Sequence, residues 1–217
     1  MSNTWRRKAV GHALVVATAA VGIVALVSGP AIAAGPLNQE HMIMNVEQAL
    51  SSKQQAIGPM AAAMAVGDMP GLTTALSEGL DAGLTVSDAK EILVQLYAYT
   101  GFPRSLNALG ELMKVLDSRR QRGVQDVPGR DPAPVPTGKE LLALGTANQT
   151  RLSGAPVKGP LFDFAPAIDE YLKSHLFGDI FARDNLDWQS RELATVAALA
   201  AMAGVESQLL PCCRQCN

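Results

Sequence analysis

The residues of this sequence best suited to chemistry are an arginine, two tyrosines and a glutamate. Arg104 follows a Gly-Phe-Pro turn close to Tyr97 and Tyr99, and its guanidinium could bind a carboxylate there. Glu192 lies near the start of an apolar, Ala-rich segment, where a carboxyl could carry a proton. Each has a structural alternative: Arg104 can be a solvated residue at a helix start, and Glu192 can interact favourably with a helix dipole.

All three cysteines, Cys212, Cys213 and Cys216, lie in the last six residues. The second and third have the Cys-x-x-Cys spacing of a redox dithiol, but three clustered thiols without a fourth ligand nearby predict no metal site. Since no other cysteine is present, we expect no disulfide framework and assign stability to helix packing. Of the three histidines, we expect His175 to be a packed or surface residue of a helix.

The elements that must position these residues all have helical patterns. Capping residues, glycines and prolines delimit the segments, and no stretch shows the alternation of a strand. We therefore expect an all-α fold. The predicted helices cover residues 52–66, 70–82, 86–97, 104–116, 139–148, 166–177 and 188–202.

The chain divides into two related parts. Residues 53–72 align without a gap on residues 190–209, each with a polar start, an Ala/Met/Leu run and a glycine, Gly67 or Gly204. Residues 119–138 contain four prolines and almost no apolar side chains to bury, which predicts an exposed linker. We expect a first helical repeat over 45–118 and a second over 139–210.

The first 34 residues have the pattern of a secretory signal peptide. A basic head at 6–8 precedes an uncharged run from Ala13 to Val27, and small residues follow the break at Pro30. A membrane anchor is the alternative, but the run is shorter than the roughly 20 residues that span a bilayer. We expect a periplasmic or secreted protein, with the export route open and no membrane association after cleavage. A net charge of −2 does not favour nucleic acid as a partner.

Two segments carry a family resemblance. In the second half, a Phe177-Gly178 turn leads through Arg183 and Leu186 to the helix start Arg191-Glu192-Leu193. In the first half, Gly83-Leu84-Thr85, Glu91-Ile92 and the 97–103 stretch resemble the later part of the same repeat. Together they resemble the carboxymuconolactone decarboxylase family, within the alkylhydroperoxidase D-like superfamily. The resemblance implies two all-α repeats and a symmetric homo-oligomer.

The resemblance also implies an activity, a lyase acting on a small carboxylated lactone. Arg104 would hold a substrate carboxylate and Glu192 would deliver a proton, with Tyr97, Tyr99 and Glu78 lining the substrate site and no cofactor or metal. Glu78 can instead belong to an exposed face, and Arg191 is expected at the surface or an interface. A non-catalytic oligomerisation or binding module on the same scaffold is the alternative.

A thiol peroxidase is the second alternative. That branch of the family places a Cys-x-x-Cys pair at 204 and 207, or one residue later, and a histidine near 212, and this sequence has none of them there. The pair at Cys213 and Cys216 is out of register, and we expect it not to face Glu192.

The last seven residues depart from the family pattern. Pro211 is expected to end the helix, and composition changes abruptly from Ala/Leu to Cys/Arg. A frameshift, a truncated gene model or a genuine short form would explain this change; under the first, another reading frame after Leu209 would encode a histidine, a Gly-Leu-Thr turn and a Tyr-rich helix. We expect the apolar face of residues 193–203 to lack its packing partners and to favour association.

Overall fold

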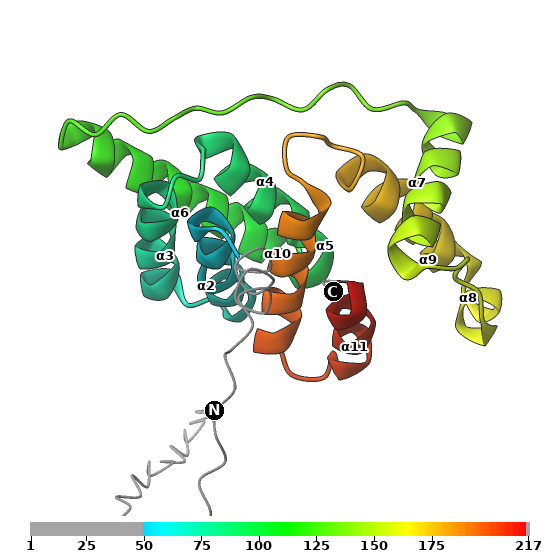
Figure 1. The fold of residues 1–217 in the computed structure, drawn as a ribbon. Helices are drawn as coiled ribbons and strands as arrows, with labels where there is room; N and C mark the ends of the chain where they lie inside the picture. Colours follow the sequence, from blue (N-terminus) through cyan, green and yellow to red (C-terminus); the bar gives the residue numbers. More distant parts are fainter. Residues whose placement is uncertain (1–49, 216–217) are drawn as a thin grey trace, which may run out of the picture. The chain divides into compact units, whose positions relative to one another are not determined.

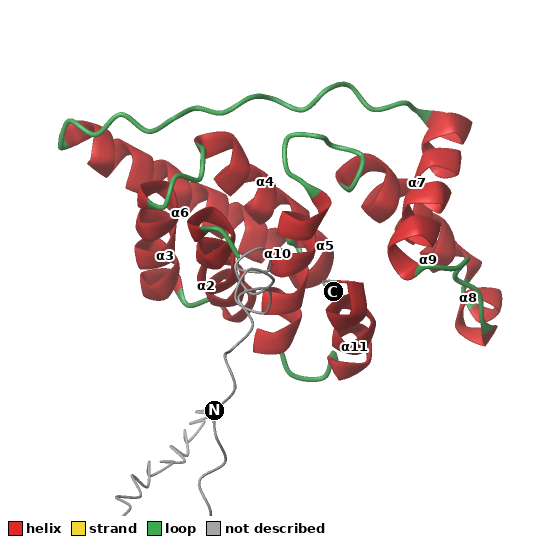
Figure 2. Cartoon of the chain, in the orientation of Figure 1, coloured by secondary structure: helices red, strands yellow, loops and turns green. Residues whose placement is uncertain are grey.

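The computed structural model describes residues 50–215, and this part of the chain contains helices and no strand (Figure 2). The all-α prediction is therefore confirmed. The predicted signal peptide and residues 45–49 lie outside the described range. None of the described helices is both long and apolar enough to cross a membrane.

The first half forms a bundle of five helices, and side-chain caps fix the starts of the first three. Ser51 and Thr85 each form a reciprocal capping box, with Gln54 and Asp88, and Asp68 accepts a hydrogen bond from the Gly71 amide. Such caps satisfy amides that the first helical turn leaves unpaired. The helices are α2 (Ser52–Val66), α3 (Met69–Asp81), α4 (Val86–Gln95), α5 (Tyr97–Thr100) and α6 (Phe102–Gln121).

The second half contains one helical pair in unusually close contact. A Cβ added to Gly145 would lie 1.7 Å from the backbone oxygen of Lys173, so only glycine allows α7 to pack directly on the backbone of η1. Asn148 adds a hydrogen bond to the Phe177 carbonyl at 2.8 Å. The elements are α7 (Gly138–Ser153), α8 (Pro160–Phe164), α9 (Pro166–Tyr171), the π-helix η1 (Leu172–Ile180), α10 (Trp188–Ala201) and α11 (Glu206–Gln215).

The main core joins the two halves, because α10 packs along α2 (Figure 1). Gly58 of α2 lies against Ala197, and Gln54 donates to Gln189 at 2.9 Å where both helices begin. Ala194, Ala198 and other apolar residues of α10 are buried in the same cluster as the α2 side chains. The expectation that this face lacks partners was wrong, since α2 of the same chain covers it.

The helix positions follow the repeat seen in the sequence. Met69 and Glu206, which are equivalent in the alignment, each begin a helix. The equivalent glycines before them, Gly67 and Gly204, both have the left-handed conformation, with φ of 78° and 81°. These matches support two related helical units, and membership of the proposed family stays a prediction.

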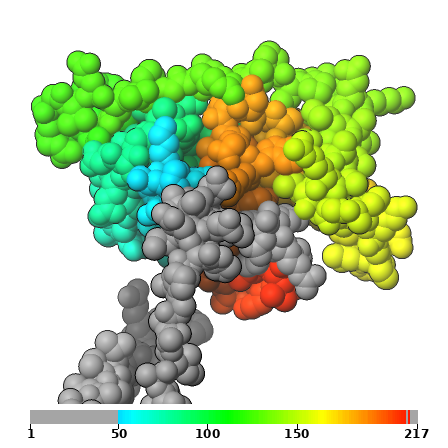
Figure 3. All heavy atoms as spheres, viewed as in Figure 1, coloured from blue at the N-terminus to red at the C-terminus, as the bar shows by residue number. Residues whose placement is uncertain are grey.

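The segment after α6 lies against the bundle. Arg119, predicted to open an exposed linker, is instead a buried residue of α6, held by Asp81 and Asp126 at 2.8 and 2.9 Å. The extended chain that follows accepts hydrogen bonds from the amides of Val86 and Ser87 at the start of α4. Figure 3 shows these residues in green along the surface.

The C-terminal helix α11 continues through Pro211 to Gln215. The prediction that Pro211 ends the helix was wrong. Pro211 is the sixth of the ten residues of α11, and a proline at that position has no amide to donate to the Ser207 carbonyl.

Candidate functional site

Glu192 lies on the buried face of α10, one turn from the helix start. Asp187 caps that start, accepting from the amide and the hydroxyl of Ser190, each at 2.8 Å. Only 4% of Glu192 is exposed, and its Oε2 has no hydrogen-bond partner among the described residues. Burial raises its pKa to about 7, against a smaller opposite effect of a hydrogen bond with the Cys212 thiol. The carboxyl can therefore both hold and release a proton near neutral pH.

Cys212 and Tyr99 interact with this carboxyl. Burial of the Tyr99 hydroxyl raises its pKa well above the usual value, and the charges of Glu192 and Cys212 act in the same direction. The hydroxyl also hydrogen-bonds Thr195. Cys212 reaches Glu192 because α11 continues past Pro211. The sequence did not predict this contact of Cys212. The expectation that Cys213 and Cys216 do not face Glu192 stays a prediction, because their side chains lie outside what the structure describes.

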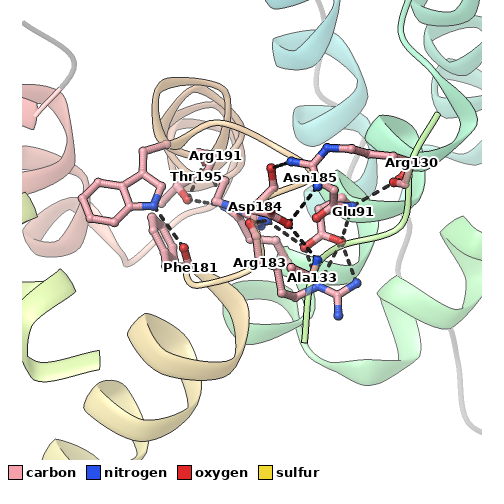
Figure 4. A network of polar contacts seen from close by, with 12 residues as sticks. Glu91, Arg130, Ala133, Phe181, Arg183, Asp184, Asn185, Arg191 and Thr195 are labelled. Atoms are coloured by element: carbon pink, nitrogen blue, oxygen red, sulfur yellow. Dashed lines mark hydrogen bonds and ion pairs between the residues drawn. The ribbon is translucent and has the colours of Figure 1, made fainter. Parts of the chain in front are cut away.

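A buried ionic network lies next to this cluster (Figure 4). Glu91 of α4 accepts from Arg183 through Nε and Nη2 at 2.8 and 3.0 Å, from Arg191 at 2.8 Å and from Asn185 at 3.1 Å. Burial alone would raise the Glu91 pKa, but the hydrogen bond from Arg183 and the charge of Arg191 hold it below its ordinary value. The network ties α4 to the loop before α10.

Gln95 connects this network to the surroundings of Glu192. Its amide nitrogen donates to the Arg191 carbonyl at 2.8 Å and to the Thr195 hydroxyl at 3.0 Å, and its oxygen accepts from Arg191 at 3.0 Å. Arg191 is fully buried, and its Nε has no partner within the described part of the chain. The prediction that Arg191 lies at the surface or an interface was wrong for this chain.

The other predicted site residues lie elsewhere. Arg104 is exposed on the first turn of α6, and Glu78 is exposed on α3. Tyr97 stacks on Phe102 with ring centroids 4.4 Å apart. Of the five predicted residues, the structure brings together only Tyr99 and Glu192.

Sequence reasoning did not single out Glu91 and Gln95 as members of the site. Both lie one turn apart among apolar residues of α4 and are buried. Polar side chains on the apolar face of an amphipathic helix were the signal available, since buried polar groups are normally paired. Between residues 50 and 215, no three His, Cys, Asp or Glu side chains gather in a way that could hold a metal ion.

Comparisons with known proteins assign no family. The sequence matches no family model, and no curated protein matches it significantly. The resemblance to carboxymuconolactone decarboxylases therefore stays a prediction, and function rests on the chemistry of the site.

Proposed function

We propose that this protein is an enzyme that transfers a proton through Glu192, acting as a lyase on a small carboxylated lactone. The observation that carries the proposal is a buried carboxyl with a pKa of about 7 and an unpaired Oε2. A general acid works best when its pKa is near the working pH. The lactone as substrate comes from the family resemblance.

The proposed reaction has a simple proton balance. Loss of the substrate carboxylate as carbon dioxide leaves its bonding electron pair on the adjoining carbon, where it delocalises into the lactone. Protonated Glu192 donates a proton to the carbon framework and is reprotonated from water. Tyr99, held by Thr195, would orient the substrate ring.

The structure does not bring Arg104 together with Glu192, so Arg104 stays a predicted carboxylate clamp outside the proposed lyase site. It is exposed, and no hydrogen bond or ion pair occupies it within residues 50–215, so it is available to an anion. Because Glu192 is buried, the proposal requires α11 to move aside when substrate enters.

The test compares two glutamates. Glu192→Gln keeps the shape but cannot carry a proton, so we expect loss of lactone turnover by about 100-fold or more. Glu140→Gln, at an exposed position of α7, should leave turnover unchanged. Turnover by the Glu192→Gln protein equal to wild type would refute the assignment. If the wild type shows no turnover but small carboxylates raise its unfolding temperature, the non-catalytic binding alternative is favoured. Arg104→Ala would then show whether that rise depends on the Arg104 guanidinium.

A second candidate function is supported by the contact between Cys212 and Glu192. A carboxylate beside a thiol can take its proton, and the resulting thiolate can attack an alkyl hydroperoxide, forming a sulfenic acid and releasing an alcohol. Hydroperoxide reduction that is lost in Cys212→Ser would favour this function over the lyase.

A further inference from the structure

A hollow of about 280 Å³ lies between the α5–α6 corner and the α9–η1 segment. Tyr97 and Phe102 form one wall, and Tyr171, Leu172 and His175 form the other. Its lining includes neither Glu192 nor Arg104. What it binds is therefore a separate question from the proposed lyase activity.

Both walls are held in place by contacts behind them. Tyr97 stacks on Phe102, which fixes the two rings of the first wall. The second wall is the π-helix η1, whose backbone is seated directly on Gly145 of α7. Stretches of π-helix in proteins frequently mark functional sites. The hollow is thus preformed, as small-molecule sites usually are.

The polar group of this hollow is a histidine already oriented by a carboxylate. His175 Nδ1 lies 2.7 Å from Asp179 Oδ2, one turn further along η1. With the proton on Nδ1 donated to Asp179, the neutral ring presents Nε2 as a hydrogen-bond acceptor. The imidazole lies 5.5 Å from the Tyr97 ring, and both members of the pair remain partly exposed. A ligand can therefore reach it.

The lining selects against anions. No lysine or arginine is among the residues that line the hollow, and the Asp179 carboxylate behind His175 would repel an anion. Aromatic walls favour a flat ring that can stack or meet them edge to face. A cavity of about 150 Å³ is already large enough for benzene, so a substituted ring fits here.

We propose that this hollow binds a neutral single-ring phenol, whose ring packs between Tyr97 and Tyr171 and whose hydroxyl donates to His175 Nε2. Asp179 acts as a positioning residue, because it keeps the proton on the opposite nitrogen. The hydroxyl provides the specificity, and the ring provides the contact area.

The first test uses three probes on the purified full chain, titrated by calorimetry or ligand-observed NMR. Phenol should bind about fivefold more tightly than anisole, which has the same ring but no hydroxyl to donate. Benzoate should bind more weakly than phenol. No binding of phenol, equal binding of phenol and anisole, or tighter binding of benzoate would each overturn the proposal.

The second test places the ligand in this hollow. Ala98→Phe, at an exposed position of the lining, should block phenol and anisole alike, whereas Ala200→Phe at an exposed position of α10 should block neither. Asp179→Asn should weaken phenol severalfold and leave anisole unchanged, a difference that a general structural defect would not produce. If Ala98→Phe is folded by circular dichroism and still binds phenol as wild type does, the site is elsewhere and the proposal is wrong.

Discussion

Glu91 and Glu192 are both buried carboxyls, but their surroundings move their pKa values in opposite directions. Glu91 receives hydrogen bonds from two guanidinium groups, whose combined effect outweighs its burial and keeps its pKa low. Within the described part of the chain, Glu192 meets no cation in hydrogen-bond contact, so burial dominates and raises its pKa to about 7. The first carboxyl is suited to holding helices together and the second to exchanging a proton.

The raised pKa of Glu192 predicts a stability that falls as pH rises. Between about pH 4.5 and 7 the folded protein keeps a proton that the unfolded chain releases, so the free energy of unfolding should decrease across this window by roughly 3 kcal/mol. Glu192→Gln should remove this part of the decrease. Urea unfolding of both proteins at pH 5 and pH 8 measures it; parallel changes in the two proteins would show that Glu192 does not titrate in this range.

Glu91 should instead contribute directly to stability at neutral pH. Glu91→Gln leaves Arg191 buried without a counter-charge, and breaking a buried pair in this way costs about 3–5 kcal/mol. Asp117→Asn, which removes an exposed pair with Arg120 on α6, should cost less than about 1 kcal/mol. Chemical denaturation at pH 7 compares the two substitutions. Similar losses from both would mean that the Glu91 network is not stabilising.

At this scale, the sequence predicted the unusual carboxyl but not its neighbours. Glu192 was identified because an acidic residue stands out at the start of an Ala-rich helix. Its contact with Cys212 depends on α11 folding back onto α10, and the burial of Arg191 depends on Glu91, which lies about 100 residues earlier in the chain. Contacts between segments that are distant in the sequence belong to the tertiary structure, and no local sequence pattern predicts them.

At the scale of elements, the close contact at Gly145 predicts that alanine substitutions at two helical glycines change the stability of the protein in opposite directions. Gly145→Ala would place a methyl group against the Lys173 carbonyl of η1, whereas Gly110 of α6 has nothing within 4 Å of an added Cβ. We expect Gly145→Ala to destabilise the protein by about 1–3 kcal/mol through overpacking, and Gly110→Ala to stabilise it by about 0.5–1 kcal/mol. Thermal unfolding of both variants gives the signs, and stabilisation by both would contradict the close packing of α7 on η1.

Helix starts were the most predictable elements, and irregular helices the least. The helices predicted to begin at residues 52, 86 and 188 do begin there, and the preceding residue, Ser51, Thr85 or Asp187, caps each one. The π-helix was missed because residues 166–177 also fit α-helical spacing. Pro211 misled because proline was taken as a helix end, whereas α11 continues past it to Gln215.

At the scale of the whole molecule, the internal repeat predicted which helices are alike but not that they would pack together. The apolar face of residues 193–203 was expected to lack its packing partners, but α2, the equivalent helix of the first repeat, covers it. Two equivalent helices thus share one core within the chain. The homo-oligomer implied by the resemblance, and export, remain predictions.

The linker that lies against α4 has a consequence for digestion by proteases. Arg130 pairs with Asp184 at 2.9 Å, the same carboxylate accepts from the Ala133 amide at 2.8 Å, and Gly129 lies against Thr85 and Ser87. A protease must bind an extended, released segment, so cutting after Arg130 should follow local opening. We expect trypsin to cleave the native protein after Arg122 before it cleaves after Arg130. Asp184→Ala should accelerate the cut after Arg130 about fivefold, whereas Asp117→Ala should not change it. Mass spectrometry of timed digests would show the order of the two cuts. If the wild-type protein is cut first after Arg130, this proline-rich stretch is not held against α4.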